Sequence, residues 1–321
     1  MKKTVLVLVL GFIMLLPTNV FGWSEHGLMT AQVIGSLSWV KDYNNITITP
    51  YTYHKYDNSV YNEKFIIKYL EGSVGDKTDA LTILSIYSDE PDWDMDTDLN
   101  LSRFQILTGN SQGYRHQRYV AFGGLLRAGV AHKRVQHFYN LSRIAFKNND
   151  AYWGFRFLAR SLHFLQDLTQ PQHALPAPNN IIIREIIDIR SFTIMCVNHH
   201  LTLEDYYQTT QIKNGNEEYI KTLREAKPAR IRNPYKSAII ASRRARRLIG
   251  NLWNRMENFF GREISAKSRF NITQDELQLL LTNPAKQEAR VKLDQTVLTA
   301  LNLFSSYSKG LVEFARRDIK F

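Results

Sequence analysis

Two histidines and an aspartate within residues 163–173 have a spacing that suits metal binding. His163 and Asp167 are four residues apart in a stretch whose apolar spacing predicts a helix over residues 151–168. Their side chains would therefore lie on one face, one turn apart. Such a pair often forms only a surface hydrogen bond, but an isolated carboxylate is costly to bury in a largely apolar helix. A bound metal ion would offset that cost.

His173 can join this pair because of the proline that precedes it. The residue before a proline avoids helical geometry, so Pro171 is expected to end the helix. The chain then turns and can bring His173 back toward His163 and Asp167. These three residues are the strongest candidate ligands.

A second pair, His200 and Glu204, has the same four-residue spacing and again shares one helical face. The neighbouring His199 would point roughly 100° away. It also has Leu203, not a carboxylate, four residues further on. We therefore take His200 as a ligand and place His199 around the site or at the surface.

Two more candidates precede these motifs. Asp92 lies in the acidic loop 88–98, which taken alone could also be a solvated tract or a calcium loop. His116 is a single histidine in a polar turn. His132 and His137 are alternatives to it, but the helix expected at residues 133–147 looks like a scaffold, so His116 is preferred.

The N-terminus has the pattern of a secretory signal peptide. Lys2 and Lys3 precede an apolar run over residues 5–16, which is short beside the span of about 20 residues that a membrane helix needs. We expect residues 1–22 to be removed, giving a secreted or periplasmic protein; an uncleaved signal anchor is the alternative. No later stretch is long and apolar enough to cross a bilayer.

Removal of residues 1–22 would create a new ligand at the N-terminus. Trp23 would begin the mature chain, and its α-amino group and carbonyl oxygen can chelate a metal ion in a five-membered ring. An α-amino group has a pKa near neutrality, so its unprotonated form is accessible. His26, three residues later, could bind the same ion.

The net charge and the cysteine content limit which partners and which sources of stability are possible. The formal charge is +11, or +9 without Lys2 and Lys3, which favours anionic partners, although a solvated basic surface explains it equally well. The most basic run is 242–247. Cys196 is the only cysteine, so no intramolecular disulfide can form. An exported protein of this size must then rely on its core, on bound metal, or on both.

The chain reads as one all-α domain over residues 23–321, with the C-terminal third as a candidate appendage. Residues 46–53 could be a strand or a loop, and 181–189 could be a helix, a strand or a membrane-facing loop. Loops are expected near residues 88–102, 108–113, 170–180 and 213–216. Helical periodicity predicts helices at residues 25–40, 120–130, 133–147, 151–168, 234–260, 274–281 and 290–317.

The order of these candidates resembles the zinc-dependent phospholipases C and the related single-strand-specific nucleases. That signature is a mature N-terminal Trp, an early His, a loop Asp, a His, then His-x3-Asp-x5-His and His-x3-Glu or His-x3-Asp. The resemblance spans residues 23–204 and is densest over 138–173; no motif matches beyond about residue 207. The matching residues are Trp23, His26, Asp92, His116, His163, Asp167, His173, His200 and Glu204.

The resemblance implies an all-α, multi-helix domain with three zinc ions in a cleft. The first ion would be held by Asp92, His116, His163 and Asp167, the second by His173, His200 and Glu204, and the third by Trp23, His26 and Asp167. Asp167 would thus bridge the first and third ions.

It also implies phosphodiester hydrolysis. Zinc lowers the pKa of a bound water and neutralises charge on phosphoryl oxygens, and Asp92 could orient or deprotonate that water. Glu204 is as in the phospholipases, whereas the nucleases generally have Asp there. Trp93 could contact a choline head group or simply pack.

The sequence therefore favours a phospholipase C that releases diacylglycerol and a phosphorylated head group, with phospholipid or a membrane surface as partner. A single-strand nuclease or nucleotidase, and a zinc-stabilised helical binding protein, are the alternatives. Single-stranded nucleic acid would be the partner in the nuclease case. The sequence indicates no oligomeric state.

Overall fold

The computed structural model describes residues 25–207, 212 and 215–321. The signal peptide expected over residues 1–22 and the proposed ligand Trp23 lie outside this part, as do residues 213 and 214 of the last expected loop. Within it the protein is all-α, with only two small antiparallel sheets. The strands are β1 (Ile46–Thr47) with β2 (Lys77–Thr78), and β3 (Tyr119–Ala121) with β4 (Leu126–Ala128).

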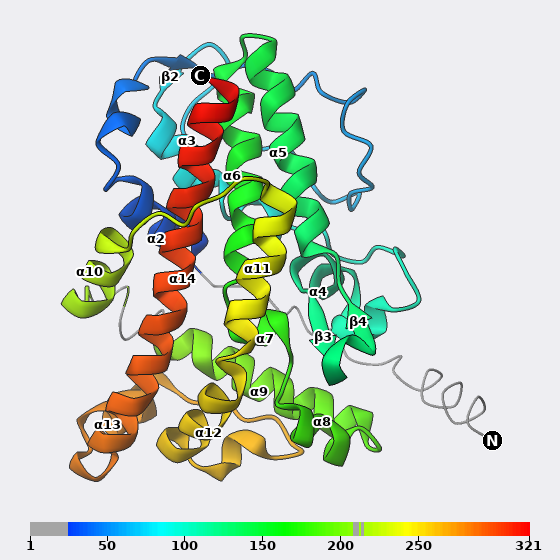
Figure 1. Cartoon of the computed structure of the whole chain (residues 1–321), viewed down its shortest axis with the longest axis vertical. Helices are drawn as coiled ribbons and strands as arrows, with labels where there is room; N and C mark the ends of the chain where they lie inside the picture. The colour runs from blue at the N-terminus through cyan, green and yellow to red at the C-terminus, as the bar shows by residue number, and fades with distance from the viewer. Residues whose placement is uncertain (1–24, 208–211, 213–214) are drawn as a thin grey trace.

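The helices follow the predicted order for most of the chain (Figure 1). Short 3-10 turns connect several of them, among them η2 (Glu90–Asp92). The α-helices are α2 (His26–Ile34), α3 (Ala80–Tyr87), α4 (Asn110–His116), α5 (Ala131–Lys147), α6 (Ala151–Asp167), α7 (Pro171–Ala174), α8 (Asn179–Glu185), α9 (Ile189–Tyr207), α10 (Glu217–Glu225), α11 (Pro234–Arg246), α12 (Ile249–Phe260), α13 (Gln274–Thr282) and α14 (Gln287–Ile319).

Helix α6 is the centre of the fold. It pairs with α5 through a tight turn in which the Asp150 side chain accepts a hydrogen bond from the Trp153 backbone N–H. Figure 1 shows α6 between α5 and α14, and it also packs against α3. All its residues from Tyr152 to Asp167 are buried. A helix covered on every side must satisfy its polar side chains internally.

Two arginines on α6 meet one buried glutamate. Arg156 forms an ion pair with Glu90, and Arg160 Nε lies 2.6 Å from Glu90 Oε2. Burial opposes ionisation of Glu90, but Arg160 and Arg156 outweigh it and lower the pKa of this carboxyl to about 2. Glu90 opens the η2 turn that ends at Asp92. The ion pairs therefore fix an acidic turn against α6, and they explain how this helix tolerates buried charge.

The helix predicted over residues 120–130 is wrong. These residues belong to the β3–β4 hairpin, in which Val120 pairs with Arg127. Gly123, Gly124 and Gly129 have φ angles of +67°, +104° and +89°. A right-handed helix needs negative φ, and glycine readily takes positive values. Glycine conformation therefore overrides the apolar spacing.

Several other boundaries differ from those predicted. The first expected helix stops at Ile34, and the expected loop at 108–113 contains the start of α4. Helix α6 ends at Asp167, so Pro171 does not end it; instead Pro171 is the first residue of α7, where its missing N–H costs nothing. The helix expected at 234–260 is two helices separated at residues 247–248. Residues 46–53 form a two-residue strand followed by loop, and α8 occupies most of 181–189.

The C-terminal helix α14 belongs to the same core as the predicted ligands. Its buried Leu301, Phe304 and Leu311 join Met29 of α2 and Leu162 of α6 in one cluster of apolar side chains. The C-terminal third is therefore part of the packed core. Among the described residues, no helix combines the length and the apolar character that a membrane crossing requires.

Gly310 offers a test of how closely α14 is packed. A Cβ there would lie 2.3 Å from the Ala229 carbonyl oxygen, so we expect Gly310→Ala to destabilise the fold by about 1–3 kcal/mol. Gly250, in α12, has nothing within 4 Å of such a Cβ, and Gly250→Ala should be neutral or stabilise by up to about 1 kcal/mol. Chemical denaturation of both variants measures the difference. Equal midpoints would contradict the close approach.

Candidate metal centre

Five of the predicted ligands converge from four separate segments. His163 and Asp167 lie on α6, His26 is the first residue of α2, His116 is the last residue of α4, and Asp92 ends η2. The three histidines and Asp167 have no exposed surface, and 13% of the Asp92 side chain is exposed. Asp92 is therefore the member of this cluster nearest to solvent.

The Asp167 carboxylate is contacted by imidazoles on both of its oxygens. His26 Nε2 lies 3.3 Å from Oδ1, and His173 Nδ1 lies 3.7 Å from the same oxygen. On the other side, His116 Nδ1 and His163 Nε2 lie 3.0 Å and 3.3 Å from Oδ2. Both oxygens of this carboxylate therefore face imidazole nitrogens and could take part in binding metal.

The chemistry of this cluster fits a metal ion. Asp92 Oδ1 lies 3.5 Å from His116 Nδ1 and 3.7 Å from His163 Nε2, and those two nitrogens are 2.9 Å apart. Both Asp167 oxygens, Asp92 Oδ1 and His26 Nε2 are buried without a hydrogen bond of good geometry. Buried polar atoms normally have a partner. Imidazole nitrogens and carboxylate oxygens gathered in this way could hold a metal ion.

Backbone and amide oxygens fix which imidazole nitrogen faces the cluster. His163 Nδ1 lies 2.7 Å from the Ser88 carbonyl oxygen, and His26 Nδ1 lies 2.7 Å from Gln166 Oε1. Each Nδ1–H therefore donates outward, which leaves Nε2 as the nitrogen with the lone pair toward Asp167. Outer hydrogen bonds of this kind orient metal-binding histidines.

Asp96 performs the same task for His116, and sequence reasoning missed it. Its Oδ2 lies 3.3 Å from His116 Nε2, so Nδ1 faces the cluster, and Asp96 is itself paired with Arg115. The acidic loop 88–98 was the available signal, but five of its residues are Asp or Glu besides Asp92. Only the fold shows which of them is buried beside His116. Asp89, also in this loop, accepts from the Gly27 backbone N–H at 3.0 Å.

The second predicted ligand set is gathered, though more loosely. His200 and Glu204 share a face of α9 and are joined at 2.9 Å between Nε2 and Oε1. The His173 ring stacks on that of His200, with centroids 5.2 Å apart. His173 is held in place by Gln170, which caps α7, and by the His116 carbonyl oxygen 2.9 Å from its Nδ1. The structure thus brings these three residues near one another, while the two groups of side chains within the described residues that could hold a metal ion both include His163.

The remaining candidate histidines lie elsewhere. His137 Nε2 is 3.0 Å from Asp57 Oδ1, and the His132 ring stands beside Tyr235. Of the three alternatives, the structure thus brings His116 into the cluster. His199 was expected either around the site or at the surface; it is buried, which excludes the surface, and its ring stacks on Trp253 with centroids 3.5 Å apart.

Trp93, which we considered for a head group, is half-buried. It packs edge-on against Tyr87, with ring centroids 6.1 Å apart. Its position favours the packing role.

Proton binding in the cluster reflects the same contacts. Burial alone would lower the pKa of His116, but the carboxylates of Asp167 and Asp96 outweigh it and raise that pKa to about 10. Burial likewise opposes ionisation of Asp167, yet the surrounding histidines hold its pKa well below the usual value. Burial lowers the pKa of His173 to about 4. His116 therefore holds a proton that a metal ion must displace.

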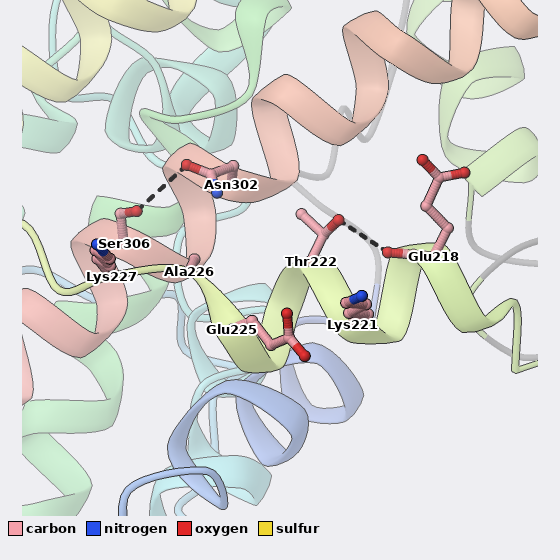
Figure 2. Close-up of a pocket in the computed structure, with 8 residues that line it drawn as sticks. All are labelled: Glu218, Lys221, Thr222, Glu225, Ala226, Lys227, Asn302 and Ser306. Atoms are coloured by element: carbon pink, nitrogen blue, oxygen red, sulfur yellow. Dashed lines mark hydrogen bonds between the residues drawn. The ribbon is translucent and has the colours of Figure 1, made fainter.

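A separate hollow lies between α10 and α14 (Figure 2). Within it, Thr222 Oγ1 donates to the Glu218 carbonyl oxygen, and Ser306 donates to Asn302. Its charged groups have both signs and include none of the predicted ligands. The lining residues are Glu218, Lys221, Thr222, Glu225, Ala226, Lys227, Asn302 and Ser306.

Any metal ion held by this cluster should bind more tightly as pH rises, because it must displace the proton on His116. Below a pKa of about 10 this imidazole is protonated, so from pH 6 to pH 8 each unit should strengthen binding of a probe ion such as zinc about tenfold per displaced proton. Competition of chelator-stripped protein with a chromophoric chelator measures this slope. The exposed His54 serves as control, and His54→Gln should leave the slope unchanged. Affinity that is independent of pH would contradict the assignment.

No protein-family model matches this chain, and no curated protein matches its sequence. Among solved structures, it is similar to the crystal structure of alpha-toxin from the avian strain SWCP of Clostridium perfringens. That match has 15% sequence identity and a TM-score of 0.27, and it covers 72% of this chain and 55% of the toxin chain. This chain thus spans about half the length of the toxin.

Proposed function

We propose that this protein is a secreted or periplasmic zinc-dependent phosphodiesterase, and that its activity is that of a phospholipase C. The observation that carries this proposal is the Asp167 carboxylate, buried with His26 on one oxygen and with His116 and His163 on the other. A carboxylate shared in this way brings metal ions close enough together to act on one phosphate group.

The proposed ligand sets are those that the resemblance implies, and the contacts of the described residues support them. Asp92, His116, His163 and Asp167 would hold the first ion, since their ligand atoms converge from three segments of the chain. His26 would hold the third ion together with Asp167 and with Trp23. The second ion would be held by the more loosely gathered set of His173, His200 and Glu204.

Zinc, Asp92 and the residues around Asp167 would have different roles in hydrolysis. Zinc, when bound, supplies a water of lowered pKa and neutralises charge on the phosphoryl oxygens. Asp92, the most exposed member of the cluster, would orient that water and accept its proton. Asp167 and the imidazoles around it hold their positions through the outer hydrogen bonds of Ser88 and Gln166.

Phospholipid is the proposed substrate because the second ligand pair ends in a glutamate, Glu204. The phospholipases that this sequence resembles also have Glu at that position. Single-stranded nucleic acid remains the alternative. We expect zinc-dependent release of diacylglycerol from phosphatidylcholine, abolished by a chelator and restored by zinc. Cleavage of single-stranded DNA in its place would identify a nuclease. Bound zinc without cleavage of either substrate would identify a binding protein.

Substitution of Asp167 tests directly whether its carboxylate bridges two metal ions. Asp167→Asn removes the anionic oxygen from both proposed ligand sets, so we expect the loss of about two zinc ions. Glu204→Gln alters only the second set and should lose about one. Metal content by mass spectrometry, with circular dichroism to confirm folding, measures both variants. Loss of the same number of ions from each folded variant would rule out a bridging Asp167.

A further inference from the structure

We propose that the β3–β4 hairpin, α8 and the last turn of α11 form a docking surface for an anionic phospholipid membrane. The surface consists of a cluster of arginines (118, 127, 243 and 246) and three exposed aliphatic side chains (Leu125, Ile183 and Ile187). The choice of a lipid partner rests on the proposed function. The surface itself is argued from its own residues.

The arginines are brought together by the packing of α11 along β3. Arg246 Nη1 donates to the Val120 carbonyl oxygen at 2.8 Å, and Arg127 is the residue paired with Val120 across the hairpin. One turn earlier on α11, Ser242 Oγ donates to the Arg118 carbonyl oxygen at 3.4 Å. These contacts fix basic side chains from two elements around one strand.

No acidic group neutralises this arginine cluster. Within the described part of the chain, none of its four members forms an ion pair. Burial lowers the pKa of Arg118, and the charges of Arg246, Arg127 and Arg243 lower it further, as expected where like charges gather. Two carboxylates lie at the end of α8, Glu185 within the helix and Asp188 in the turn after it, but Lys267 lies 3.8 Å and 3.9 Å from them. The cluster therefore keeps its positive charge for a partner.

The aliphatic side chains lie on the elements next to the arginines. Leu125, at the tip of the hairpin, is 92% exposed. Ile183 in α8 is 62% exposed, and Ile187, two residues beyond the end of α8, is 92% exposed. A second small core joins the two elements, because Ala121 of β3 packs with Ile181 of α8. Figure 1 shows the hairpin and α8 at the same end of the molecule. Single exposed apolar side chains are common, but a group of them on adjoining elements marks an interaction or membrane surface.

The combination favours a membrane over a nucleic acid. Aliphatic side chains insert into the acyl boundary of a bilayer, while arginines bind lipid phosphates. Single-stranded nucleic acid is instead held by aromatic stacking platforms, and the three most exposed apolar side chains here are aliphatic. The surface also borders the metal cluster, because the Arg118 backbone N–H donates to the His173 carbonyl oxygen at 2.9 Å. A docked bilayer would thus present its phosphates beside the proposed second ion.

Binding to vesicles tests this surface with matched variants. We expect sedimentation with phosphatidylglycerol-rich vesicles and little with pure phosphatidylcholine vesicles. Arg127→Gln with Arg243→Gln should weaken binding roughly tenfold to thirtyfold, at about fivefold for each charge. Leu125→Ser should weaken it several-fold. The controls are Arg230→Gln with Arg232→Gln, before the start of α11, and Leu279→Ser in α13; both involve exposed residues and should bind as the unaltered protein does.

The outcomes separate this surface from the proposed activity. Hydrolysis of a short-chain, water-soluble phosphatidylcholine should be unchanged in the docking variants, because their residues are not ligands. Vesicle binding that depends on these residues, without any lipid hydrolysis, would support the surface and overturn the proposed substrate. Equal binding losses in the controls, or no vesicle binding at all, would overturn the surface. So would loss of single-stranded DNA binding in the arginine variant with vesicle binding unaffected, which would indicate a nucleic-acid surface.

Discussion

A carboxylate buried at the centre of an all-helical core is the constraint on which the rest of the structure depends. Asp167 has no exposed surface and lies at the end of a helix that is covered on all sides. An isolated charge in such a place would be strongly unfavourable. Four histidines from four segments contact this carboxylate and offset its charge. Each of them is positioned by a different helix. The packing of α2, α4, α6 and α7 can therefore be understood as the means of surrounding one side chain.

The sequence was sufficient for the parts of the site that depend on local geometry. His163 with Asp167, and His200 with Glu204, were predicted as pairs because residues four apart share a helical face in any context. The identity of His116 could be settled only by tertiary structure, since three histidines lie within residues 116–137. The side chains that orient the histidines could not be predicted from the sequence for the same reason. Gln166 and its partner His26 are 140 residues apart, and no spacing rule connects them.

The errors in the predicted fold also have a physical cause. Apolar spacing over residues 120–130 suggested a helix. This spacing carries no information about φ at the glycines, and their positive φ angles are compatible with a hairpin but not with a right-handed helix. Pro171 was read as a terminator although proline serves equally well as the first residue of a helix. The hairpin also matters for the proposed docking surface, because it carries Arg127 and directly follows Arg118. A helix over residues 120–130 would have presented Arg127 differently.

The pairing of Glu90 with Arg156 and Arg160 has a consequence for how metal ions enter the protein. The same turn that these ion pairs hold against α6 supplies Asp92, and Ser88, two residues before this turn, supplies the carbonyl that orients His163. The acidic turn is thus ordered by contacts that involve no ligand atom. Metal uptake then needs no folding of this turn, so its rate should depend on access to the cluster and on proton release. On the proposed function, a protein built in this way would release and rebind metal ions without rearranging this turn.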